Sequence, residues 1–213
     1  MMEYLDTETQ QYPIQLHELQ QPNTSYPSNW QPPSRYQIVF PAPPPAYDRI
    51  TETVRLTNPV LTDKGHYEQV YEILPLDIDS IRANTVTFAE QLIEQVKALH
   101  QEKLYSDVTA VFPAGVKEIQ FRDEVDRTNL SDVSQVAMGL IMAGQATTLV
   151  VYRTKDNQNQ TLTAEEMVSV AMGVFQEKQD IVTNMWIHKD TIRALSDTYD
   201  LAGLRDYDVT TGW

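Results

Sequence analysis

The side chains best suited to acid–base or metal chemistry are scattered along this chain. The histidines lie far apart, at His17, His66, His100 and His188, and there is no cysteine. A zinc site needs several nitrogen, sulfur or oxygen donors at converging spacings, and no such spacing is present. The sequence therefore predicts no metal and no cofactor. We expect His188, on or near the apolar stripe of a helix, to be partly buried and hydrogen-bonded.

Carboxylates also offer no convincing catalytic pair. Glu165 and Glu166 are adjacent, so their side chains point in different directions. Glu166 is accounted for by a capping box that starts at Thr163. Arg122 and Asp123, with Asp126 and Arg127, are typical of a solvated structural ion-pair set at the junction of a strand and a helix. The phosphate-binding and nucleophile motifs GxxxxGK[ST], GxGxxG and GxSxG do not occur, so we expect no catalytic residue and no enzyme.

The overall charge limits the partners. Acidic residues number 30 against 16 basic ones, which gives a net charge of −14. Such a field repels phosphate, so neither nucleic acid nor an anionic membrane surface is an expected partner. No run of about 18 apolar residues is present, so we expect no membrane insertion. The first twenty residues lack the basic and apolar regions of a secretory signal, which indicates synthesis in the cytoplasm without export by that route.

The positioning elements begin with residues 1–45, which contain nine of the twelve prolines and no glycine. Proline fixes φ and lacks a backbone donor, so this segment predicts an extended Pro/Gln/Tyr-rich arm, with polyproline II at residues 41–45. A disordered leader is the alternative. Aromatic side chains favour an arm that contacts a neighbouring subunit. The predicted partner-binding residues are Tyr4, Tyr12, Tyr26, Trp30 and Tyr36.

Residues 46–76 alternate apolar and polar side chains and predict a β-hairpin. Asn58-Pro59 and the Asp63-Lys64-Gly65 segment supply its turn chemistry. A lone hairpin is only marginally stable, so we expect it to pack on another element or another chain.

Residues 77–106 predict one long helix, capped by Asp77 or Asp79, because apolar side chains recur every three or four positions. Two interpretations of this stripe stay open. It covers the core of the following domain, or it is a coiled-coil seam between copies. The seam residues would be Ile81, Phe88, Leu92, Val96 and Leu99.

Residues 107–196 predict a small α+β domain of short antiparallel strands packed by two helices. Strands are expected at residues 108–112, 116–121 and 148–153, with helices that start near Asp123 and Thr163. The tetrapeptide Val-Ala-Met-Gly occurs twice, at residues 136–139 and 170–173, which raises the possibility of an internal repeat and of close helix approach at the glycines.

Residues 197–213 form an acidic tail in which Tyr199, Tyr207 and Trp213 could dock. The fold class is therefore α+β, preceded by the extended arm, the hairpin and the long helix.

Several of these segments resemble a known family. Phe112-Pro113-Ala114-Gly115, then residues 119–123, Leu162-Thr163-Ala164-Glu165-Glu166-Met167 and Trp186 with Lys189-Asp190 follow in the order of an uncharacterised domain family of bacteriophage tail-fibre and tail-assembly proteins. The resemblance covers about residues 108–195. It implies a place in a tail fibre, a baseplate or their assembly, and it carries no catalytic residues.

The expected function is accordingly a structural virion component of a phage tail, either a fibre subunit or a fibre-to-baseplate adaptor. The alternative is an assembly chaperone that binds the fibre transiently. Its partners would be other tail or baseplate proteins and further copies of itself, with a trimer expected by analogy to tail fibres. The sequence does not identify a host receptor.

Overall fold

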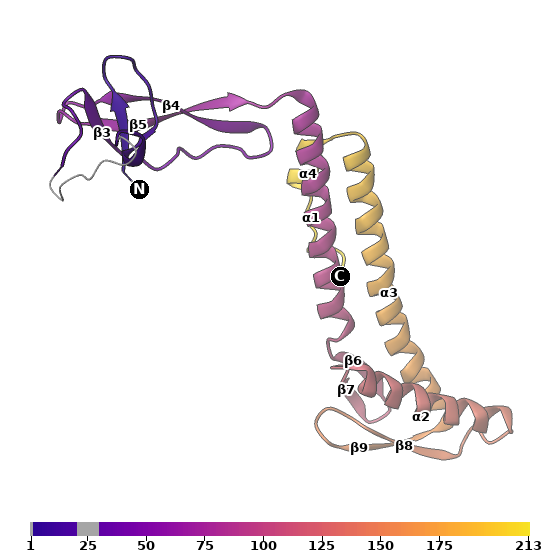
Figure 1. The fold of residues 1–213 in the computed structure, drawn as a ribbon. Helices are drawn as coiled ribbons and strands as arrows, with labels where there is room; N and C mark the ends of the chain where they lie inside the picture. The colour runs from indigo at the N-terminus through magenta and orange to yellow at the C-terminus, as the bar shows by residue number, and fades with distance from the viewer. Residues whose placement is uncertain (1, 21–29) are drawn as a thin grey trace. The chain divides into compact units, whose positions relative to one another are not determined.

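The computed structural model of the chain describes residues 2–20 and 30–213 (Figure 1). It confirms the predicted α+β class, with a β-sheet in the first part of the chain and helices with two small hairpins in the second. The chain divides into two compact units, Met1–Asn84 and Thr85–Trp213. We call them the sheet unit and the helical unit.

The sheet unit is built on one five-stranded sheet. Its strands are β1 (Glu3–Asp6), β2 (Ile14–Gln15), β3 (Tyr36–Phe40), β4 (Glu52–Leu61) and β5 (Tyr67–Pro75), in the spatial order β2-β1-β3-β5-β4. A short 3-10 helix, η1 (Leu16–Glu18), follows β2. The β3–β5 pair is parallel and the other pairs are antiparallel.

The expected separate arm at residues 1–45 is therefore wrong. Residues 3–6 and 36–40 form strands of the same sheet as the hairpin, and β3 lies between β1 and β5. Both stretches are free of proline, so their backbone donors can join the ladder. Leu5 and Val39 are buried, which contributes apolar burial that favours the folded sheet. The described prolines of residues 1–45 lie outside β1, β2 and β3, in the connections.

The predicted hairpin at residues 46–76 is present as β4 and β5. Its turn contains Gly65 at φ +80°, a left-handed conformation that glycine adopts without steric cost. Asn58-Pro59 does not form part of the turn. It lies within β4, where the pairing register shifts between Thr57 and Val60. Proline lacks the N–H that a regular ladder position needs, and an irregularity in the strand accommodates it.

The helical unit contains two successive hairpin–helix units after a long helix. The long helix is α1 (Ile78–Leu104), whose first turns are counted with the sheet unit. The hairpin of β6 (Val108–Phe112) and β7 (Gly115–Ile119) leads to α2 (Glu124–Met142), and that of β8 (Leu149–Arg153) and β9 (Asn159–Thr163) leads to α3 (Ala164–Asp197). A short α4 (Leu201–Asp206) ends the series. No strand was predicted at β9, although Gln160 and Leu162 are buried and alternate with exposed residues.

The helix ends follow the sequence signals. Asp77 accepts hydrogen bonds from the backbone of Asp79 and Ser80 at the start of α1. Asp123 accepts from two backbone amides at the start of α2, and Thr163 and Glu166 form the predicted capping box of α3. At the end of α2, Gly144 has φ +76°. The amides of Gly144 and Gln145 donate to the carbonyls of Ile141 and Leu140, which is a Schellman motif.

α3 packs into two separate cores along its length. Its first half joins α2 and the two hairpins in the hairpin core, which includes Phe112, Ile119, Phe121, Leu130, Leu162, Met167 and Val174. Its second half joins α1, α4 and the C-terminal tail in the helix core, which includes Leu92, Val96, Ile192, Leu204 and Val209. The pairing of α1 with α3 is visible in Figure 1.

The apolar stripe of α1 lies in the helix core of its own chain, and not in the predicted seam between copies. Leu92 and Val96 are buried inside this chain, and Phe88 and Leu99 pack against the same cluster. Ile81 is half-buried and precedes the helical unit. Three heptads of apolar spacing suit either a seam or an internal core, and the partner helix within the chain takes this face.

Lys178 lies where the two cores meet. It is buried, and its ammonium group donates to the carbonyls of Lys103 at 3.0 Å and Ser106 at 2.6 Å. The same group lies 4.8 Å from the ring centroid of Phe121. A cation at the carboxyl end of α1 satisfies carbonyls that have no helical partner. Burial lowers the pKa of Lys178.

The two Val-Ala-Met-Gly segments do not occupy equivalent positions. Val136 lies 12 residues after Glu124, the first residue of α2, whereas Val170 lies 6 residues after Ala164, the first residue of α3. A Cβ added at Gly139 or Gly173 would meet no atom within 4 Å. The expected close approach of the helices at these glycines is therefore wrong.

The C-terminal tail docks on α3 through His188. The imidazole Nδ1 pairs with the Tyr207 hydroxyl at 2.8 Å, and Nε2 pairs with the Thr211 carbonyl at 2.9 Å. The Trp213 ring stacks on His188 with the centroids 5.2 Å apart. The predicted hydrogen bonding of His188 is confirmed, and the side chain is buried rather than partly buried. Tyr207 and Trp213 dock as expected, whereas Tyr199 is exposed.

Candidate partner-binding pocket

The sheet unit carries a pocket of about 550 Å³ that is lined largely by aromatic and apolar side chains. This volume lies in the range of typical ligand pockets. Tyr4, Trp30 and Tyr36, three of the five predicted partner-binding residues, line it together. We call it the aromatic pocket. Its other lining residues are Met2, Leu16, Gln31, Pro32, Ser34, Gln37, Ile38, Phe40, Gly65, His66 and Tyr67.

Strand pairing places the main lining residues on one face of the sheet. Tyr4 lies opposite Ile38 in the β1–β3 ladder. Opposite residues of an antiparallel pair share a face, and residues two apart on one strand do as well. Tyr36, Ile38 and Phe40 therefore lie on the face of Tyr4. Tyr4 is buried, whereas Ile38 and Phe40 remain 43% and 48% exposed.

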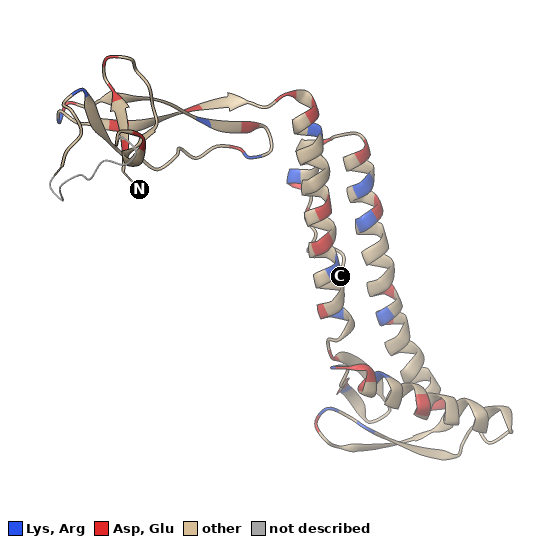
Figure 2. Cartoon of the chain, in the orientation of Figure 1, with Lys and Arg blue, Asp and Glu red and all other residues tan. Residues whose placement is uncertain are grey.

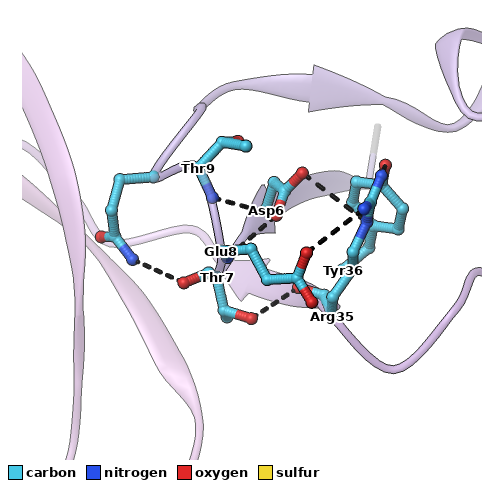
Figure 3. A network of polar contacts seen from close by, with 7 residues as sticks. Asp6, Thr7, Glu8, Thr9, Arg35 and Tyr36 are labelled. Carbon is cyan, nitrogen blue, oxygen red and sulfur yellow. Dashed lines mark hydrogen bonds and ion pairs between the residues drawn. The ribbon is translucent and has the colours of Figure 1, made fainter.

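A polar network, drawn in Figure 3, holds the lining residue Tyr36 in place. The Arg35 guanidinium donates to the Tyr36 hydroxyl and lies over the Tyr36 ring at 4.6 Å from its centroid. It also pairs with Glu8 at 3.3 Å and with Asp6 at 3.7 Å. The Thr7 hydroxyl donates to the Arg35 carbonyl at 2.9 Å. The turn after β1 therefore orients Arg35, and Arg35 orients Tyr36.

Asp6 is the buried carboxylate of this network. Burial by itself raises the pKa of such a group, but hydrogen bonds from the backbone of Glu8 and Thr9 and the charge of Arg35 outweigh it. The resulting pKa of Asp6 lies below its ordinary value. The carboxylate is thus ionised at neutral pH and can hold the Arg35 guanidinium in place.

The opposite side of the pocket is held by a second aromatic contact. The rings of Phe40 and His66 meet edge to face, with the centroids 4.9 Å apart. His66 Nε2 in turn pairs with a Glu68 carboxylate oxygen at 2.7 Å. Ile38, Phe40 and His66 were not among the predicted partner-binding residues. The alternation of Tyr36, Ile38 and Phe40 in a proline-free run was the available signal.

The remaining two predicted partner-binding residues do not line the pocket. The Tyr12 hydroxyl donates to Glu3 at 2.5 Å and accepts from the Gln69 side chain at 2.9 Å. Burial and the Glu3 carboxylate raise the pKa of Tyr12 to about 12. Tyr12 therefore joins β1 to β5 inside the sheet unit. Tyr26 lies outside the described residues.

The aromatic pocket differs in charge from the rest of the chain. Acidic side chains occur in both units, including along α1 (Figure 2). Among the described residues that line the pocket, none is Asp, Glu, Lys or Arg. The site therefore suits an uncharged ligand better than an ion.

The other residues considered for chemistry have structural roles. Glu166 caps α3, and Arg122 pairs with Asp126 at 3.0 Å. The Nε2 atom of His100 is buried without a hydrogen-bond partner. Burial, and to a smaller extent the charge of Lys189, lowers the pKa of His100.

Within residues 2–20 and 30–213, no three His, Asp or Glu side chains are grouped as a metal ion would require. None of the described helices combines the length and apolarity needed to cross a bilayer.

The fold and the pocket define an α+β protein with a ligand-sized aromatic pocket on its sheet unit. Residues 88–209 match a family described as a domain of unknown function, DUF4376. The match covers more than half of the chain, so the chain belongs to this family. The matched range lies within the helical unit, whereas the aromatic pocket lies in the sheet unit. No curated protein and no solved structure matches the chain.

Proposed function

We propose that this protein is a structural component of a bacteriophage tail, as a fibre subunit or a fibre-to-baseplate adaptor. The tail context comes from the resemblance of residues 108–195 to tail-fibre and tail-assembly proteins. The observation that carries an assembly role is the aromatic pocket, in which Trp30, Tyr36 and Phe40 lie together and the described lining residues include no charged side chain. Aromatic residues gathered in a pocket are the usual anchors of protein–protein contacts.

The helical unit supports an adaptor role with a surface of its own. Val111 and Val116 lie opposite each other in the β6–β7 hairpin and are 76% and 63% exposed. Leu149 and Val151 are likewise exposed at alternate positions of β8. Exposed apolar groups that share a strand face are typical of interaction surfaces. Each unit therefore offers a surface for a different tail or baseplate protein.

In this proposal the chain acts by binding and not by catalysis, and it needs no cofactor. After synthesis in the host cytoplasm it is built into the virion tail. Self-association accompanies assembly, and a trimer remains our proposed state by analogy to tail fibres. The extended arm no longer supports the proposal, because residues 3–6 and 36–40 belong to the sheet.

Mass spectrometry of purified particles from the phage that encodes this chain tests the proposal. We expect the chain in intact virions, at a fixed ratio to known tail proteins. Its absence from intact virions would overturn the structural role.

The alternative is an assembly chaperone that leaves before the particle is complete. The same pocket would then hold the fibre only transiently. Co-expression with the neighbouring fibre gene distinguishes the two roles. A chaperone is indicated if fibre oligomers form only when this chain is present and no longer contain it afterwards.

A further inference from the structure

We propose that the aromatic pocket of one copy binds residues 41–45 of another copy in the polyproline II conformation. The inference rests on the proposed assembly role of the pocket, and it names the partner. It does not depend on the tail context.

The ligand chemistry follows from the lining. Residues 41–45 read Pro-Ala-Pro-Pro-Pro, a sequence that is stiff and extended before it binds. Segments of this kind dock in grooves lined by aromatic rings, because the flat rings pack against the pyrrolidine rings at little entropic cost. Trp30, Tyr36 and Phe40 provide such rings here.

Charge also favours this ligand. The chain carries a net charge of −14, so most surfaces of two copies repel each other. Residues 41–45 and the described pocket lining contain no Asp, Glu, Lys or Arg. A contact between these two neutral regions avoids the burial of an unpaired carboxylate.

The hydrogen-bond donors of the pocket also complement the acceptors of residues 41–45. A prolyl residue offers a carbonyl acceptor and no N–H donor. The Tyr36 hydroxyl accepts from Arg35, which can only donate, so the phenolic hydrogen remains able to donate to a ligand. The Ser34 hydroxyl and the Gln31 amide add donors to the lining. The pocket thus offers donors to a ligand that supplies five carbonyl acceptors and a single backbone N–H, that of Ala42.

Strand register indicates that the segment comes from another copy. Phe40 lies opposite Glu68, and β4 begins at Glu52, opposite Pro75. The chain between β3 and β4 therefore follows β5 away from the pocket, which is lined by residues 65–67 at the start of β5 (Figure 1). Pro41, Pro43, Pro44 and Pro45 are all exposed along this path. They are open to a neighbour but directed away from their own pocket.

The contact joins two different surfaces, the segment of one copy and the pocket of another. Copies joined in this way can form a closed assembly in two ways. Two copies can exchange segments around a two-fold axis, or three copies can bind head to tail in a ring. Both arrangements fill every pocket. The mass in solution distinguishes them.

The test is the mass of the full-length chain measured by sedimentation and light scattering over a range of concentrations. We expect a dimer or trimer for the natural sequence. Pro44→Glu places a charge on an exposed residue of the segment and should raise the dissociation constant about tenfold or more. Gln101→Glu adds the same charge to an exposed position of α1 and should leave the mass unchanged. Trp30→Ala removes the pocket side of the contact and should also give monomers.

Mixing the two monomeric variants provides the decisive control. Pro44→Glu keeps an intact pocket, and Trp30→Ala keeps an intact segment, so an equal mixture should form a complex that neither forms alone. A natural chain that is monomeric at every concentration would overturn the proposal, as would an unchanged mass for Pro44→Glu. Binding of neutral oligosaccharides that depends on Trp30, without self-association, would assign the pocket to glycans instead. None of these results bears on the presence of the chain in virions, so the two proposals fail separately.

Discussion

Lys178 shows how one buried cation holds two parts of the helical unit. Its ammonium donates to the carbonyls of Lys103 and Ser106 at the end of α1. Lys178→Met keeps the length of the side chain but leaves both carbonyls without this donor, so we expect a loss of about 1–3 kcal/mol. Urea unfolding of the full chain measures it. Lys97→Met, at an exposed ion pair, should change stability by no more than about 0.5 kcal/mol. Equal effects of the two variants would contradict the role of Lys178.

A pH-dependent prediction arises where the two hairpins meet. The Asp156 carboxylate accepts from the Lys117 ammonium at 2.8 Å and from the Thr154 hydroxyl at 2.6 Å. These contacts lower the pKa of Asp156 from 3.8 to about 2. Because the folded pKa is the lower one, the stabilisation is complete above about pH 3.8 and is lost as the pH falls through about 2.

Thermal melting of the natural chain and of Asp156→Asn between pH 6 and pH 2 checks this sign. The natural chain should melt higher at pH 6, and the difference should shrink below about pH 4. A difference that stays constant down to pH 2 would exclude the ion pair as its source.

At the residue scale, the sequence predicted what local chemistry determines. The caps at Asp77, Asp123 and Thr163 and the αL residue Gly144 depend only on neighbours within a few positions. The partners of Lys178 and Arg35 lie 72 and 27 positions away along the chain. No local pattern in one sequence carries that information.

The docking of the C-terminal tail is a prediction for the element scale. Trp213 stacks on His188, and its indole nitrogen donates to the Val209 carbonyl at 2.8 Å. Trp213→Ala removes apolar contact from the helix core and should cost about 2 kcal/mol. Trp186 on the same helix as His188 is 53% exposed, and its replacement by alanine should cost less than about 0.5 kcal/mol. Urea unfolding compares the two, and a larger loss at Trp186 would contradict the docking.

The open helical glycines give a second prediction at this scale. Gly139 lies inside α2, and an added Cβ would meet nothing within 4 Å. Gly139→Ala should therefore stabilise the isolated protein by about 0.5–1 kcal/mol, because alanine loses less backbone entropy in a helix. Thermal or urea unfolding measures the gain. A loss of stability would show that a side chain at this position meets an obstacle.

Elements with a strong period could be predicted from the sequence, and elements that depend on distant pairing could not. The long helix predicted at residues 77–106 was confirmed as α1, because its apolar side chains recur every three or four residues from Ile81 to Leu99. The short strands β1 and β3 were missed because prolines surround them and their partners lie elsewhere in the chain. The choice between an internal core and a seam could not be made from α1 alone, since both need the same stripe.

At the scale of the whole molecule, the chain consists of a helical unit that matches a family and a sheet unit, earlier in the sequence, that lies outside the match. The DUF4376 match begins at residue 88, within α1, and ends at residue 209 in the docked tail. The sheet unit lies outside the match and carries the aromatic pocket. We therefore expect the pocket to determine what this particular chain assembles with, while the helical unit presents the exposed valines of β6 and β7 to a second partner.

If this chain is a phage tail component, as we propose, the most direct test is a cryo-EM reconstruction of the mature tail. We predict density for this chain as a built-in component, with residues 41–45 of one copy in the aromatic pocket of its neighbour. A complete tail map without this chain would contradict the account, and so would a map in which the pocket is open and the copies do not touch.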